Sequence, residues 1–173
     1  MITFNTKRHI EIIEGNQGIN LTEFAIGVGE LISNDQIIEL FIHSKQFSFD
    51  SLRDCVKVEP EMGYLRQAFD INKIKIYDFK KTDKHGLSKF LLDYINEPDW
   101  GDDINEFTLL VSRYFEIHSQ LGDNEFYILS KDWFNKEDER LIEPESWAYT
   151  YYFLIISLDR KSNLLTLAEW TYD

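Results

Sequence analysis

Hydrophobic residues recur at helical spacing in three stretches of the chain, residues 34–45, 86–96 and 104–121. The third stretch starts directly after Asp103 and contains Glu106, and these two residues have the Asp-x-x-Glu spacing of a capping box. In a capping box, two side chains satisfy amide groups that are free at the start of a helix. The three patterns predict three helices, of which the strongly apolar one at residues 34–45 should be packed into the core rather than lie on its surface.

A further helix is predicted over residues 21–33. Asn20 directly precedes this stretch and Glu23 follows three residues later, which gives a second capping-box spacing, and we expect only a short strand or turn before Asn20. Gly27 and Gly29 lower the helix propensity of the stretch. They would mark a point of close packing between helices.

Other stretches have the alternation and the branched or aromatic residues of strands. Residues 71–79 alternate apolar and polar side chains, which predicts a strand with one solvated face. Residues 147–158 and 164–172 flank the polar turn DRKSN and predict a C-terminal β-hairpin, with a third strand at residues 125–129. The order of elements predicts an α+β fold, with helices packed on one face of a mostly antiparallel sheet.

Size and composition fit one domain over residues 1–173. Hydrophobic residues make up 43% of the chain, which is enough for a packed core. Cys55 is the only cysteine, so it can form neither an intramolecular disulfide nor a thiolate metal cluster, and an inert buried thiol is expected. The longest apolar run is too short for a membrane helix, and no signal peptide is recognisable at the start. These features predict a cytoplasmic protein.

Negative charge is concentrated in one part of the chain. The formal net charge is −13, and residues 93–145, with 15 acidic and four basic residues, account for −11 of it. Such a field attracts cationic partners and is repelled by nucleic acid and by anionic lipid. We therefore expect a cationic protein partner and no binding to nucleic acid or membranes.

The usual motifs of catalysis and cofactor binding are missing from the sequence. The four histidines (His9, His43, His85 and His118) have no metal-ligand spacing, and no glycine-rich phosphate loop occurs. The acidic tract EPDWGDDINE lacks the ligand spacing of an EF-hand, and for Asp103 and Glu106 helix capping is the simpler role. We therefore expect no cofactor, no metal and no enzymatic activity.

Tryptophans and a phenylalanine are interleaved with the acidic residues. A solvated face is the simplest origin of a charge run, but crowded acids destabilise the free fold, and large aromatics beside charges are common anchors of protein interfaces. The residues that we expect to contact a partner lie in two tracts, EPDWGDDINE and KDWFNKEDERLIEPESW: Asp99, Trp100, Asp102, Asp103, Trp133, Glu137, Asp138 and Glu139.

In size and in these acidic, aromatic tracts the chain resembles the bacterial immunity proteins that neutralise polymorphic or contact-dependent growth-inhibition toxins. The resemblance covers the general character of the chain and includes no signature motif. It implies a tight one-to-one complex with a basic toxin domain, often a nuclease, whose cationic cleft the carboxylates would cover. Opposite electric fields would speed that association.

Two alternatives remain open from the sequence. An acidic DNA mimic would use the same electrostatics, with acids spaced at phosphate-like intervals. A small hydrolase or metal-dependent enzyme would need a site assembled from scattered residues such as His85, His118, Asp99 and Glu106. The sequence identifies neither the partner nor the oligomeric state.

Overall fold

The computed structural model of the chain describes residues 2–27, 32–48, 64–65, 69–70, 73–96, 103–118, 124–130 and 151–172. Its main feature is a six-stranded sheet with the order β1-β2-β8-β7-β6-β5, in which every neighbouring pair is antiparallel. The strands are β1 (Thr3–Glu14), β2 (Gln17–Gly27), β5 (Lys80–Thr82), β6 (Glu125–Ser130), β7 (Tyr151–Asp159) and β8 (Leu164–Tyr172).

Helices and a small second sheet complete the described structure. The second sheet pairs β3 (Tyr64–Leu65) with β4 (Phe69–Asp70). The helices are α1 (Asn34–Ile42), α2 (Lys45–Ser48), α3 (Lys84–Ile95) and α4 (Ile104–Ile117), together with a 3-10 turn at Ile76–Asp78. Among the described residues no helix has the length and apolar character needed to cross a membrane.

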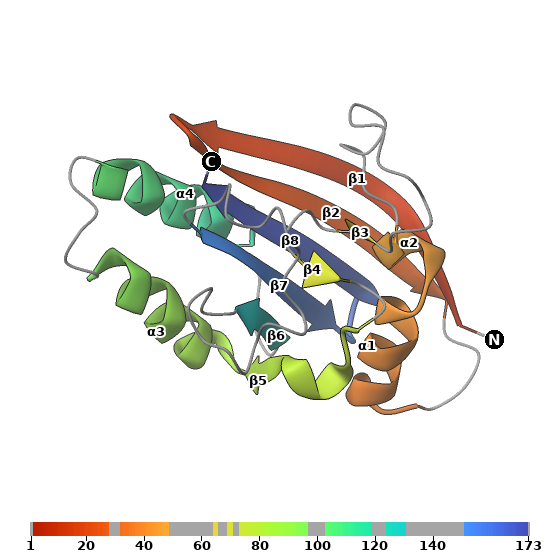
Figure 1. Cartoon of the computed structure of the whole chain (residues 1–173). Coiled ribbons are helices and arrows are strands. Elements are labelled where there is room, and N and C mark those ends of the chain that lie inside the picture. Colours follow the sequence, from red (N-terminus) through yellow and green to blue (C-terminus); the bar gives the residue numbers. More distant parts are fainter. Residues whose placement is uncertain are drawn as a thin grey trace.

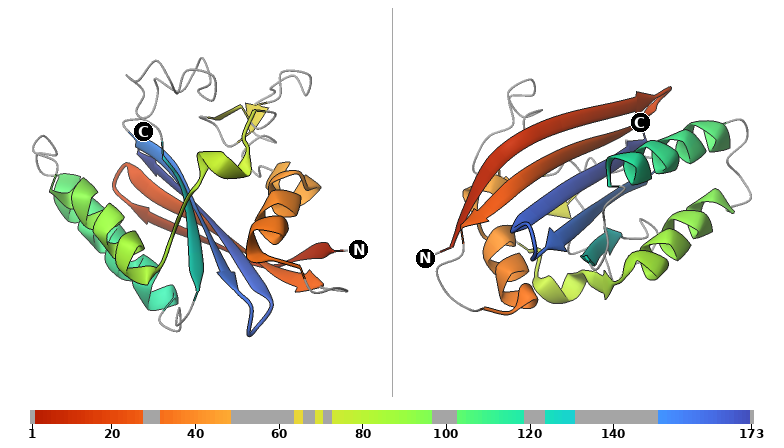
Figure 2. Two further views of the ribbon diagram at one scale, coloured as in Figure 1. Left: turned by 90° about the horizontal axis from the view of Figure 1, so that it is seen from below. Right: turned by 180° about the vertical axis from the view of Figure 1, so that it is seen from behind.

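Helices cover both faces of the large sheet (Figures 1 and 2). Phe41 of α1 belongs to the hydrophobic cluster on one face, whereas Leu91 of α3 and Phe107 of α4 belong to the cluster on the other. The prediction that the helices pack on one face was wrong. Helices are needed on both faces because residues 151–158 of β7 are all buried. A strand with two apolar faces must be covered on both sides.

Several elements were predicted correctly. The α+β class, the mostly antiparallel sheet and the C-terminal hairpin of β7 and β8 are confirmed, and β6 is the predicted third strand. The helices α1, α3 and α4 lie within or close to the three predicted stretches. In the hairpin turn Asn163 has a φ of 49°, a left-handed conformation that asparagine tolerates better than most residues.

The helix predicted over residues 21–33 was wrong. Most of that stretch is β2, which pairs with β1 and β8, and the expected short opening element is the 12-residue strand β1. Side chains of β2 alternate between the two faces of the sheet, so Leu21 and Phe24 enter different hydrophobic clusters. A buried Glu23 stands where the capping-box glutamate was expected, and it pairs with Arg8 instead.

Two further predictions need correction. The strand expected at residues 71–79 is replaced, where the chain is described, by the 3-10 turn at Ile76–Asp78 and the short strand β5 that follows it. Asp103 and Glu106 form no capping box, because the Asp103 side chain makes no capping hydrogen bond. Its carboxylate is bonded to Tyr172 instead. The α4 helix ends at Ile117, and residues 119–121 of its predicted range lie outside the described residues.

Candidate functional site

The structure describes one of the eight residues predicted to contact a partner. Asp103 is half-buried at the start of α4. The other seven lie outside the described residues, so their place on the surface stays a prediction: Asp99, Trp100, Asp102, Trp133, Glu137, Asp138 and Glu139. The question for the structure is therefore where the segments that carry them leave the fold.

The seven residues belong to two segments of the chain. Residues 97–102 connect α3 to α4, and residues 131–150 connect β6 to β7. The first contains three acidic residues and no basic one, and the second contains six acidic and three basic residues. Because α3 and α4 run antiparallel along one face of the sheet (Figures 1 and 2), the end of α3 and the start of α4 lie at the same end of the molecule.

The last turn of α3 contacts both ends of the second segment. The Tyr94 hydroxyl lies 3.0 Å from the hydroxyl of Ser130, the last residue of β6. The Tyr94 ring also packs 5.7 Å, centroid to centroid, from the ring of Tyr151, the first residue of β7. The points where the chain leaves α3, leaves β6 and enters β7 are therefore adjacent.

The start of α4 is joined to the same place by hydrogen bonds. Tyr151 donates its hydroxyl proton to Gln17 Oε1 at 2.8 Å, and Gln17 Nε2 donates to the Asp103 carbonyl at 2.9 Å. The Tyr172 hydroxyl donates to the Asp103 carboxylate. We call Gln17, Tyr94, Asp103, Ser130, Tyr151 and Tyr172 the anchor cluster. It joins all four points where the two acidic segments leave and re-enter the described fold.

The electrostatics of the anchor cluster keep its tyrosines protonated. The hydrogen bond to the Asp103 carboxylate raises the pKa of Tyr172 above its ordinary value, and burial raises the pKa of Tyr151. Both hydroxyls therefore remain neutral donors at neutral pH. Because Asp103 already accepts from Tyr172, it stabilises the cluster whether or not it also touches a partner.

The residues named for the enzyme alternative do not form one site where they are described. Glu106 lies near the start of α4 and His118 caps its end, so twelve residues of helix, about 18 Å, separate them. His85 is exposed in the first turn of α3, and Asp99 lies outside the described residues. Within the described ranges no group of three or more His, Cys, Asp or Glu side chains could hold a metal ion.

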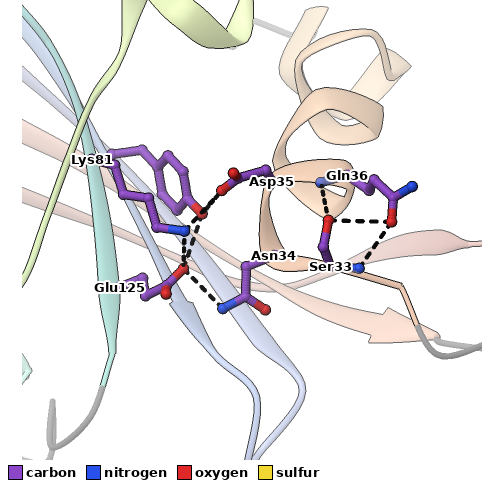
Figure 3. Close-up of polar contacts among 7 residues, drawn as sticks. Ser33, Asn34, Asp35, Gln36, Lys81 and Glu125 are labelled. Carbon is purple, nitrogen blue, oxygen red and sulfur yellow. Dashed lines mark hydrogen bonds and ion pairs between the residues drawn. The ribbon is translucent and has the colours of Figure 1, made fainter.

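A second polar network lies where α1 meets the edge of the sheet (Figure 3). Lys81 Nζ of β5 lies 2.9 Å from both Asp35 Oδ1 and Glu125 Oε2. The buried Tyr127 donates to the same carboxylates at 2.7 and 3.0 Å, and Asn34 Nδ2 donates to Glu125 Oε2 at 2.9 Å. The network attaches the first turn of α1 to β5 and β6.

The charges of this second network compensate one another. Hydrogen bonds to Lys81 and Tyr127 lower the pKa of Asp35, and the two carboxylates raise the pKa of Lys81. Burial raises the pKa of Tyr127, with a further contribution from its acidic neighbours. Every charged group therefore has a partner of the other sign, so a structural role explains the network without a reaction. Sequence spacing gave no signal for it, because its members come from three separate elements.

Comparison with known proteins adds little to this picture. No protein-family model matches the chain, and no curated protein matches its sequence. Its structure is similar to the crystal structure of citrus MAF1, with 14% sequence identity over 93% of this chain and 90% of that one. The TM-score of 0.40 is too low for that similarity to support an argument.

Proposed function

We propose that this protein is an acidic binding protein, an immunity protein that neutralises a basic toxin domain by covering its cationic site. The observation that carries the proposal is the anchor cluster, from which both acidic segments depart. The eight predicted contact residues belong to these segments or, in the case of Asp103, to the cluster itself. Two acidic tracts that are far apart in sequence thereby start from one end of the molecule.

The anchor cluster gives the acidic segments firm attachment points. Gln17 and Tyr151 are buried, and their side chains are joined by a hydrogen bond across 134 residues of sequence. Tyr94 packs against Phe107 and Phe153 as well as Tyr151. A binding surface whose attachment points are already ordered loses less conformational entropy when a partner binds. Such an attachment suits an inhibitor that must bind tightly.

Exposed leucines flank the first acidic segment. Leu92 of α3 is 52% exposed and Leu109 of α4 is 50% exposed, and each is within two turns of the residues that join the helices. Trp100 lies between them in sequence. Protein interfaces combine apolar anchors with a charged surround, so the leucines supply the apolar component beside the carboxylates.

Basic residues are concentrated at the opposite end of α3. Residues 73–89 contain six lysines and two acidic residues. Lys80, Lys81 and Lys84 are exposed on β5 and the first turn of α3, and the rise of the helix places Lys84 about 12 Å from its last turn. This distance exceeds the Debye length of about 8 Å at physiological salt, so the field of the lysines is largely screened at the last turn of α3, after which the first acidic segment begins.

The test uses a toxin domain encoded beside this gene in the host genome. Co-expression with the protein should restore growth of cells that make the toxin. Reversing two acids, Asp99→Lys with Asp102→Lys, should weaken binding to the purified toxin and reduce the salt dependence of the dissociation constant, because fewer charge pairs form at the interface. The double variant should keep the unfolding temperature of the wild type.

The matched control reverses Glu39 and Glu116, two exposed acids on α1 and the last turn of α4. This variant has the same change in net charge and should bind almost as tightly as the wild type. If both double variants bind alike, or if the protein gives cells no protection, the proposal fails. Competition with duplex DNA for a DNA-handling protein would favour the DNA-mimic alternative.

A further inference from the structure

The outer edge of the sheet is formed by β1. Its inner side pairs with β2 over its whole length, and no strand among the described residues pairs with its outer side. The register shifts between Thr6 and Arg8, so a bulge at Lys7 divides β1 into residues 3–6 and residues 8–14, each of which pairs with β2 in a continuous register. Bulges and lysines are devices that block pairing at a sheet edge. The longer part, from Arg8 to Glu14, contains neither a bulge nor a lysine.

Charge is segregated along β1. Lys7, Arg8 and His9 come first, and Glu11 and Glu14 follow, so the formal charge of the strand is zero in a chain of net charge −13. Arg8 and Glu14 have partners on the α4 side of the sheet, Glu23 and Arg113. This strand is therefore a place where two copies of an acidic protein can approach without strong repulsion.

The opposite face of β1 carries exposed side chains that form no ion pair within the described part of the chain. His9 and Glu11 are exposed there, as is Lys7 at the bulge, and none of the three forms an ion pair with another described residue. His9 Nδ1 lies 2.9 Å from the Thr22 hydroxyl of β2. The Ile13 side chain, on the same strand, is 59% exposed. Because His9, Glu11 and Ile13 alternate with inward-facing Ile10 and Ile12, they point away from α4.

We propose that β1 is a self-association edge, through which two copies of this protein pair antiparallel about a two-fold axis at Ile10. In that register His9 of one copy lies opposite Glu11 of the other. Lys7 is the diagonal neighbour of that same Glu11. An axis at Glu11 would set two glutamates opposite each other. An axis at His9 would bring the bulge at Lys7 into the pairing. The register at Ile10 avoids both and forms each favourable contact twice.

The oligomeric state in solution tests the proposal. Sedimentation velocity over a wide range of protein concentration should show a reversible dimer. Backbone amides of residues 8–12 should exchange hydrogen more slowly as the concentration rises. A protein that stays monomeric throughout, or a dimer in which these amides are unaffected, would overturn the proposal.

Charge swapping tests the register. Lys7→Glu and Glu11→Lys should each raise the dissociation constant of the dimer about threefold to tenfold, because each places like charges near one another twice across the axis. The double variant, K7E with E11K, should return it close to the wild-type value. Glu39→Lys, an exposed change on α1, is the control and should have no effect. Equal dissociation constants for all variants would show that the dimer forms elsewhere.

Discussion

His118 is a buried side chain whose hydrogen bonding is incomplete. It caps the end of α4, is 7% exposed, and its Nε2 atom has no hydrogen-bond partner among the described residues. Its ring lies 4.6 Å from that of Tyr114, centroid to centroid. Burial lowers the pKa of His118 to about 4, with Arg8 acting in the same direction and Glu23 against it. The imidazole is therefore neutral in the folded protein at neutral pH.

This pKa predicts a pH dependence of stability. In the unfolded chain His118 should titrate near its ordinary pKa of 6.5, so between about pH 6.5 and pH 4 the unfolded state binds more protons. The free energy of unfolding should therefore fall as the pH falls through that window, by up to about 3 kcal/mol from this residue. Urea unfolding at a series of pH values measures the fall.

His118→Leu is the matching variant. It removes a group that is already neutral and incompletely bonded, so stability at pH 7 should change little. The difference in stability between wild type and variant should then shift in favour of the variant as the pH is lowered from 6.5 to 4. An identical pH profile for the two proteins would show that His118 does not titrate as the structure indicates.

Among the elements, the hairpin of β1 and β2 shows best what the sequence could and could not predict. Amphipathic helices with one apolar face were predicted well, as α4 illustrates. The hairpin was missed because the polar residues Gln17 and Glu23 lie on the same buried face of β2 as Ile19 and Leu21, which disguises the alternation of the strand. The tight turn at Gly15 and Asn16 was the available signal, since Gly-Asn between two apolar runs is typical of a hairpin.

The conformation of Gly15 in this turn predicts how its replacement by alanine changes the stability of the protein. Gly15 has a φ of 58°, which disfavours any residue with a Cβ, and an added Cβ would overlap the Glu106 carboxylate. Gly15→Ala should lower the free energy of unfolding by about 1–2 kcal/mol, measured by urea denaturation. Gly18→Ala is the control, because an added Cβ there meets only ordinary contacts. Equal losses for both variants would contradict the assignment of strain to the turn.

For the whole molecule, the distribution of charge was visible in the sequence but the convergence of its acidic segments was not. A count of the acidic and basic residues shows that the net negative charge is concentrated in residues 93–145. The meeting of the described residues that border these segments depends on contacts between residues far apart in sequence, such as Gln17 with Asp103 and Tyr94 with Ser130. Local patterns carry no information about such pairs. Seven of the eight predicted contacts remain predictions of the sequence.

The most direct test of the binding account is a hydrogen-exchange footprint of the protein in complex with the toxin that it neutralises. The account predicts slower exchange on binding in residues 97–103 and 131–150, where both acidic segments meet the anchor cluster. The lysine-rich residues 80–89 should exchange at the same rate in the free and bound protein. Protection confined to residues 80–89, with the acidic segments unchanged, would contradict the account.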